Sequence, residues 1–147
     1  MRSFQFPLER VLGWRRIELR TAEARLAPLV AESCRLSAAH LAIAGAHERA
    51  QRDLLSSGPV DGAQLEALAR YRTRLEKQKA IVEQKAQLCR EQIAAQQVRI
   101  IEAQRRARLL EKLRSRRLEE WRVAGEREME NFAGEAFLAR WQPHRRP

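Results

Sequence analysis

The residues that could carry out chemistry in this chain are few, and their spacing does not assemble a catalytic or metal site. His40 and His47 stand at heptad spacing on one helical stripe, but no carboxylate or cysteine is placed to complete a ligand set with them. Glu119 and Glu120 are adjacent, so on a helix they point in different directions and form no acid–base pair. Glycine-rich phosphate loops are absent from the sequence. We therefore predict no cofactor, no metal and no enzymatic activity.

The two cysteines, Cys34 and Cys89, fall within expected helices at positions that do not face each other. They are interpreted as small residues of the helix contact rather than as a disulfide, and a reducing cytoplasm is the expected environment. No stretch approaches the roughly 18 apolar residues that cross a bilayer. The first residues also lack the hydrophobic block of a signal peptide.

The net charge of +10 predicts attraction to an acidic partner: nucleic acid, an anionic membrane surface or an acidic protein patch. Basic residues are concentrated between Arg99 and Arg117 and again between Arg2 and Arg20. If the chain folds back on itself, these two blocks should lie side by side. A solvated charged helix face is the alternative interpretation.

The elements that position these residues are indicated by a leucine and alanine repeat. Apolar residues recur at alternating steps of four and three from Leu8 to Leu54, and the pattern resumes from Leu65 to Ala124. This period is the one that two helices wound around each other require. The break at 56–59 folds the chain back, so the predicted fold is all-α, with two long helices in an antiparallel coiled-coil hairpin and the second helix longer.

The predicted organisation is one hairpin over 1–147. Helix one spans about 7–55, the turn about 56–62, helix two about 63–140, and a basic tail 141–147. Pro7 suits a first helical turn, whereas Pro28 should kink or loosen helix one. Asp61 and Gln64 fit a capping box that opens helix two.

Polar residues interrupt the predicted helix contact near the turn. With the chain reversing near residue 59, His40 faces Lys79 and His47 faces Arg72. Four basic or titratable groups would then oppose one another, which should loosen the turn end and make it mobile. Extension of the Arg and Lys side chains to solvent is the competing interpretation.

The unequal arms leave residues 111–140 without a partner in the chain. This stretch nevertheless carries large apolar side chains, among them Phe132, Phe137 and Trp141. Such residues on an uncovered helix usually mark a surface for a partner. A frayed or domain-swapped end, and a homodimer through 111–140, remain as alternatives.

Three segments together resemble the FliJ family, the coiled-coil protein of the bacterial flagellar export apparatus. They are Phe4–Leu12 (FQFPLERVL), Gly58–Tyr71, and Leu110–Trp121 (LEKLRSRRLEEW). The first is similar to the family's F-x-F-x-L-E-x-V-L opening, and the third to its L-E-K-L…R-R…E-x-W run. The aromatic C-terminal end and Pro28 depart from the family pattern.

The resemblance implies a non-catalytic, stalk-like export component, cytoplasmic and peripheral at the inner face of the membrane at the flagellar base. The implied partners are a hexameric flagellar export ATPase, the cytoplasmic domain of the export gate protein, and export chaperones. The ATPase ring is expected to contact the open end of the hairpin, through Phe4, Phe6, Leu8, Arg10, Trp14, Arg114, Arg117, Leu118 and Trp121. The export gate is expected to contact the turn end, through Leu54, Leu68, Tyr71 and Leu75.

Two hypotheses from other classes stay open. One is a basic nucleic-acid-binding coiled coil, although no specific nucleic-acid motif is present. The other is a structural homodimer.

Overall fold

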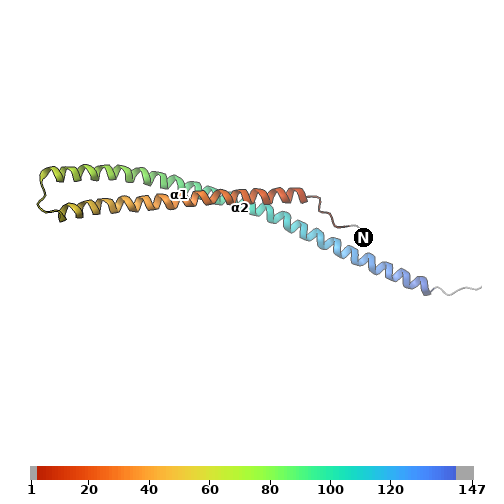
Figure 1. The fold of residues 1–147 in the computed structure, drawn as a ribbon. Coiled ribbons are helices and arrows are strands. Elements are labelled where there is room, and N and C mark those ends of the chain that lie inside the picture. Colours follow the sequence, from red (N-terminus) through yellow and green to blue (C-terminus); the bar gives the residue numbers. More distant parts are fainter. Residues whose placement is uncertain (1–2, 142–147) are drawn as a thin grey trace, which may run out of the picture. The chain divides into compact units, whose positions relative to one another are not determined.

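The computed structural model describes residues 3–141, and within them all regular structure is α-helical. Helix α1 spans Glu9–Ser56 (48 residues) and α2 spans Gly62–Trp141 (80 residues). Figure 1 shows both helices, coloured red to yellow and green to blue along the chain. The predicted all-α fold with a longer second helix is confirmed.

Helix α1 begins at Glu9, two residues after Pro7, because a tight turn precedes it. The Glu9 amide donates to the Phe6 carbonyl (3.1 Å), and the Leu12 amide donates to the Leu8 carbonyl (2.9 Å). Pro7 thus occupies a position where its missing N–H costs no helical hydrogen bond. Helix α1 continues through Pro28.

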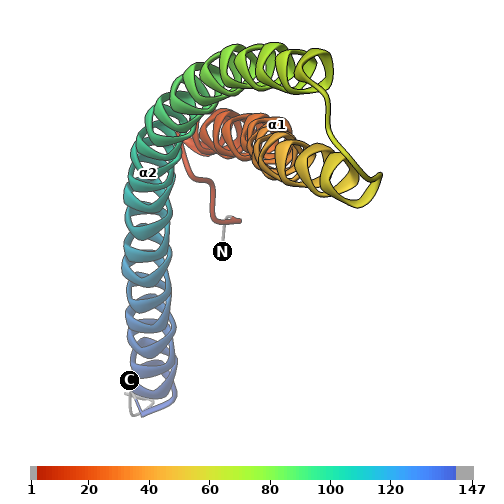
Figure 2. The same cartoon turned by 90° about the vertical axis from the view of Figure 1, so that its left-hand side faces the viewer.

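The turn between the helices is closed by local hydrogen bonds. The Ser57 amide and hydroxyl both donate to the Leu54 carbonyl, at 3.3 and 2.8 Å. Gly58 has φ of 109°, a left-handed conformation that favours glycine. The predicted capping box is present: the Gln64 amide donates to Asp61 Oδ1 (2.8 Å), and the Asp61 amide donates to Gln64 Oε1 (3.1 Å). Figure 2 views the molecule from this turn.

The chain divides into two compact units, which are described separately. Unit 1 comprises 1–19 and 103–147, and unit 2 comprises 20–102.

In unit 2, α1 and α2 pack in antiparallel orientation. Gln96 of α2 bonds Ala22 of α1, Cys89 bonds Leu29, and Glu83 contacts His40, so numbers fall along α2 as they rise along α1. The covered residues of α2 follow the predicted steps of three and four: Leu68, Leu75, Val82, Ala86, Cys89, Ile93, Gln96 and Ile100. Those of α1 include Ala22, Leu26, Leu29, Ser33, Leu36, His40, Ile43, His47, Ala50 and Leu54. The two helices thus form the predicted antiparallel coiled-coil hairpin.

Two polar groups inside this contact are satisfied across the helices. Gln96 is 5% exposed, and its Nε2 donates to the Ala22 carbonyl at 2.8 Å. The buried Cys89 thiol donates to the Leu29 carbonyl at 3.3 Å. Buried polar residues in coiled coils often specify register, and these two bonds tie α2 to α1 at specific positions.

Unit 1 has an apolar core built from the N-terminal segment, the start of α1 and α2. Leu12 is fully buried (0% exposed), and Phe6, Ala103 and Ala107 are 8%, 4% and 4% exposed. From residue 126 to residue 141, every residue of α2 is exposed. No helix within 3–141 combines the length and the apolar content needed to cross a membrane.

Candidate protein-docking surface

All nine residues predicted to contact an ATPase ring belong to unit 1, although Phe4 and Trp121 are 117 positions apart along the chain. They come from the N-terminal segment, the first turns of α1 and the part of α2 that packs on them. Their exposure differs widely, and it separates residues that build the unit from residues that can meet a partner.

The aromatic residues Phe4, Phe6 and Trp121 mainly build the unit. The rings of Phe4 and Trp121 lie 6.1 Å apart at 57°, a tilted arrangement that favours aromatic pairs. Phe6 is buried, and Phe4, Trp121 and Leu118 are half-buried. These contacts tie the N-terminal segment to α2.

Leu8, Arg10 and Trp14 are exposed on the same unit. Leu8 is 37% exposed and Trp14 is 56% exposed. The Arg15 guanidinium lies 4.4 Å from the centre of the Trp14 ring, a cation–π contact that holds the indole against α1. Arg10 makes no ion pair with any described residue. These three side chains can therefore reach a partner without unfolding the unit.

The basic blocks of the two helices lie side by side in unit 1, as predicted, and carboxylates of each helix pair with arginines of the other. Arg114 Nε lies 2.9 Å from Glu9 Oε2, and Arg16 Nη2 lies 2.9 Å from Glu111 Oε1. Arg106 pairs with Glu18 at 3.6 Å. In the sequence, glutamates of one helix and arginines of the other stand beside the apolar positions of the helix contact. This pattern is the signal that could have revealed these pairs.

Arg117, one of the residues predicted to contact an ATPase ring, points outward from the helix contact. Its side chain is 63% exposed and pairs with Glu120 at 3.1 Å, while the neighbouring Leu118 is half-buried. The covered stripe runs through Arg114, Leu118 and Trp121, with a step of four where the strict heptad requires three. An α-helix has 3.6 residues per turn, so an extra step of four keeps the stripe on one face.

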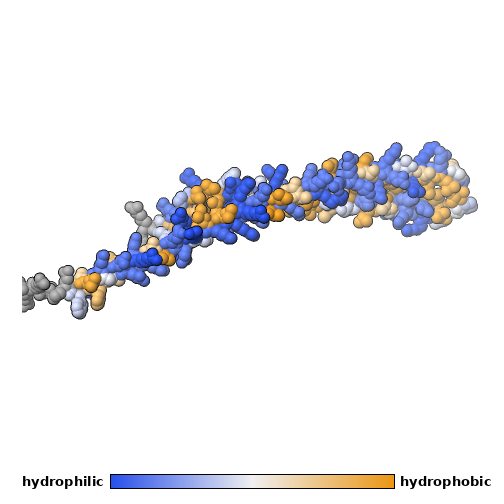
Figure 3. Space-filling model, turned by 180° about the vertical axis from the view of Figure 1, so that it is seen from behind, coloured by the Kyte–Doolittle hydropathy of each residue, from blue (hydrophilic) through white to orange (hydrophobic). Residues whose placement is uncertain are grey.

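Large apolar side chains continue along α2 after the contact with α1 ends. Met129, Phe132, Phe137, Leu138 and Trp141 are 65%, 73%, 64%, 66% and 77% exposed. Figure 3 shows hydrophobic atoms, in orange, at this end of α2. The tail 142–147 lies outside the described residues.

The four residues predicted to contact an export gate lie in unit 2 near the turn. Leu54 and Leu68 are half-buried, Leu75 is 7% exposed, and Tyr71 is 38% exposed. Leu75 therefore belongs to the core between the helices, and Tyr71 is the most accessible of the four. Nearby, Leu65 is 55% exposed, so the apolar contact thins towards the turn.

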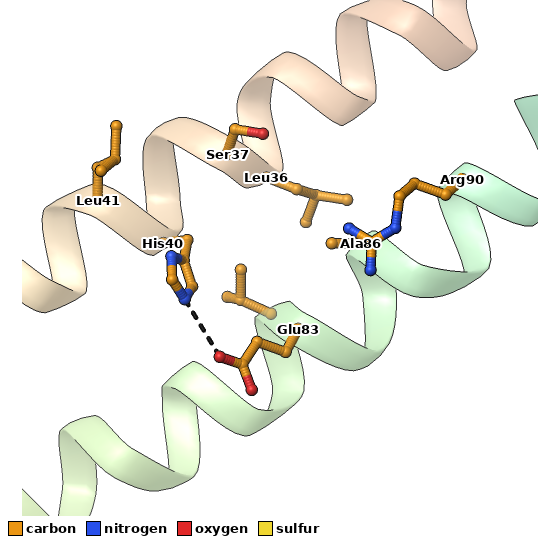
Figure 4. A pocket seen from close by; sticks show the side chains of 8 residues that line it. Leu36, Ser37, His40, Leu41, Glu83, Ala86 and Arg90 are labelled. Atoms are coloured by element: carbon orange, nitrogen blue, oxygen red, sulfur yellow. Dashed lines mark hydrogen bonds and ion pairs between the residues drawn. The ribbon is translucent and has the colours of Figure 1, made fainter.

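His40 does not face Lys79 alone, as the sequence predicted, but meets Glu83. His40 Nε2 lies 3.2 Å from Glu83 Oε1, and Lys79 Nζ lies 3.8 Å from the same oxygen. Figure 4 shows the His40 and Glu83 side chains pointing towards each other. A carboxylate thus bridges two basic groups that were expected to repel each other.

A shallow groove of about 400 Å³ lies beside this pair, lined by Leu36, Ser37, His40, Leu41, Val82, Glu83, Ala86 and Arg90. The Ser37 hydroxyl donates to the Ser33 carbonyl at 3.0 Å, so it is not aligned as a nucleophile on His40. Within residues 3–141 there is no group of three or more His, Cys, Asp or Glu side chains that could hold a metal ion. The groove supplies an apolar surface with a few charges.

Unit 2 also contains a histidine, an ion pair and two cysteines outside this groove. His47 Nδ1 is buried without a hydrogen-bond partner. Arg35 Nε and Nη2 donate to the two oxygens of the Glu32 carboxylate at 2.7 and 2.6 Å, and this hydrogen bonding lowers the pKa of the Glu32 carboxyl. Both cysteines are free thiols, Cys34 exposed and Cys89 buried.

No family model, curated protein or solved structure matched the chain in comparisons with known proteins. The functional argument therefore rests on the residues and the geometry above.

Proposed function

We propose that this chain is a non-catalytic helical adaptor that binds partner proteins through unit 1, as a stalk-like component of the flagellar type III export apparatus. The observation that carries the proposal is the set of exposed apolar residues on unit 1, from Leu8 before α1 and Trp14 on α1 to Phe132 on α2. Exposed apolar surface of this extent on a small helical protein usually marks a protein-binding site.

The resemblance of Phe4–Leu12 and Leu110–Trp121 to the FliJ family supplies the identity of the partners. Both segments belong to unit 1, where α1 and α2 pack together. In the proposal this unit contacts a hexameric export ATPase, and Tyr71 and its neighbours near the turn contact the export gate protein. The protein would then act in the cytoplasm at the flagellar base and would also engage export chaperones.

The proposal is tested by titrating a purified flagellar export ATPase with the full chain and measuring ATP hydrolysis. We expect stimulation, with Trp14→Ala and Arg10→Ala each weakening the apparent affinity by about tenfold, the effect of removing a strong interface residue. Neither residue is part of the unit 1 core. Leu41→Ala is the matched control, because Leu41 is 72% exposed but belongs to unit 2.

A second candidate, nucleic-acid binding, rests on Arg105, Arg108 and Lys112. These residues share one face of α2 by their spacing and make no ion pair with any described residue. Binding to unrelated DNA that falls steeply with salt, together with no effect on the ATPase, would favour this function over export.

A further inference from the structure

The apolar stripe of α2 that contacts the start of the chain continues in phase beyond this contact. It runs through Trp121, Gly125, Met129, Phe132, Ala136 and Ala139, at steps of three and four residues. Trp121 is half-buried and Gly125 is buried, whereas every one of the later positions is exposed. The same face of α2 is therefore used for helix packing in its first part and is uncovered in its second.

One edge of the uncovered stripe is acidic and the other carries both signs of charge. By helical spacing, Glu128 and Glu135 lie along the acidic edge, and Glu126 and Arg140 lie along the other. None of these three carboxylates pairs with a basic residue in the described chain, although most glutamates that precede them do, including Glu119 and Glu120 beside them. In a protein of net charge +10, unpaired carboxylates bordering an apolar stripe point to a basic partner.

We propose that residues 126–141 bind an amphipathic helix of another protein, one whose apolar stripe is bordered on one side by lysine or arginine. The bound helix would extend the existing packing face of α2, with its basic residues opposite Glu128 and Glu135. The available stretch is about 24 Å long, enough for a helix of some four turns. This inference deepens the proposed function, on which it rests, by giving the chemistry of one partner.

A second copy of the chain fits this surface less well. In an antiparallel pair, the edges that carry Glu128 and Glu135 would face each other and place like charges together. In a parallel pair, only Glu135 would gain a basic partner, Arg140. Self-association through the stripe is therefore an outcome that would overturn the proposal.

The test uses the full chain and two labelled helical peptides of about 20 residues, which share a leucine stripe and differ only in lysine or glutamate along one edge of that stripe. Binding is measured by fluorescence anisotropy near 0.15 M salt. We expect the lysine peptide to bind at least about tenfold more tightly than the glutamate peptide. Equal binding, or no binding of either, would overturn the proposal.

Variants locate the site. Phe132→Asp, in the stripe, should weaken the lysine peptide by about tenfold or more. Leu138→Asp is the matched control: Leu138 is 66% exposed, against 73% for Phe132, but lies off the stripe. An equal loss in both variants would contradict the proposal.

Charge reversal tests the partner chemistry. The double variant Glu128→Lys, Glu135→Lys should invert the preference towards the glutamate peptide, whereas Glu130→Lys, on the opposite face, should leave it unchanged. An unchanged preference in the double variant would exclude the edge formed by Glu128 and Glu135 as the place where the basic residues of the peptide bind. Concentration-dependent mass in sedimentation, removed by Phe132→Asp, would show that a second copy occupies the stripe.

The two proposals fail in different ways. Selective peptide binding without any effect on the export ATPase would remove the export role and leave the basic-helix site intact. ATPase stimulation without a preference for the lysine peptide would support the export role and remove the basic-helix site.

Discussion

Units 1 and 2 join the same two helices by different means. In unit 2 the contact contains buried polar groups, and Gln96 and Cys89 each donate to a backbone carbonyl of α1. In unit 1 the buried residues within 3–19 and 103–141 are apolar or glycine, and charged pairs such as Glu9–Arg114 lie at the edges. Buried hydrogen bonds are insensitive to salt, whereas exposed ion pairs are screened. The register of the two helices is thus fixed by hydrogen bonds inside the contact in unit 2, and by ion pairs at the edges of the contact in unit 1.

The units also differ in what they leave uncovered. In unit 2 each helix has the other as a partner as far as the turn. In unit 1, α2 continues beyond the last contact with the N-terminal segment, and the apolar stripe is exposed. A repeating apolar pattern therefore does not by itself say whether the chain supplies the partner.

The largest expected loss of stability comes from truncating a buried leucine in the core of either unit. Leu12→Ala in unit 1 and Leu36→Ala in unit 2 remove side chains that are 0% and 3% exposed. Each should lower the free energy of unfolding by about 2–5 kcal/mol, because a cavity is left as well as lost burial.

The two changes can be told apart by their probes in urea unfolding. All three tryptophans (Trp14, Trp121 and Trp141) lie in unit 1 and the single tyrosine, Tyr71, lies in unit 2. Leu12→Ala should shift the tryptophan transition more, and Leu36→Ala the tyrosine transition more. Equal shifts of both probes by both variants would mean that the units unfold together. The two cores would then not have separate free energies of unfolding.

An intermediate effect is expected at Gln96. Gln96→Ala should cost about 1–2 kcal/mol, from the lost bond to Ala22 and the lost packing. Gln96→Leu should be close to neutral, because it replaces a buried polar side chain by an apolar one of similar size. Urea unfolding of the two variants checks this. A loss as large in Gln96→Leu as in Gln96→Ala would mean that the hydrogen bond, rather than the volume of the side chain, holds unit 2 together.

The smallest effect is expected at the ion pairs of unit 1. A double-mutant cycle of Glu9→Gln and Arg114→Gln should give a coupling of about 0.2–1 kcal/mol that shrinks towards zero in 1 M salt, since both side chains are partly exposed. Thermal unfolding at low and high salt measures it. A coupling that persists in high salt would indicate that the pair is shielded from solvent. The contact in unit 1 would then resemble that in unit 2, where the polar bonds are buried.

Much of the fold could be predicted from short-range patterns. The helical stripe from Leu8 to Leu54, the break before Gly58 and the capping box at Asp61 depend on residues three or four positions apart, where helical geometry is nearly invariant. The resemblance supplied the candidate docking residues of unit 1, and the fold-back of the chain predicted that they would lie in one unit. Which of them are buried was not predictable, since Phe6 and Leu8 are both large apolar residues of the N-terminal segment, yet Phe6 is buried and Leu8 is 37% exposed.

The sequence by itself determined the type, length and packing face of each helix, because these follow from local periodicity. Only the tertiary structure decided which charges meet. His40 contacts Glu83 as well as lying near Lys79, and Arg117 pairs within its own helix while Arg114 reaches Glu9. Side chains lean towards the N-terminus of their own helix, so in an antiparallel pair they reach beyond the residue directly opposite. The size of that displacement depends on how the two helix backbones pack. It therefore cannot be obtained by counting residues along the sequence.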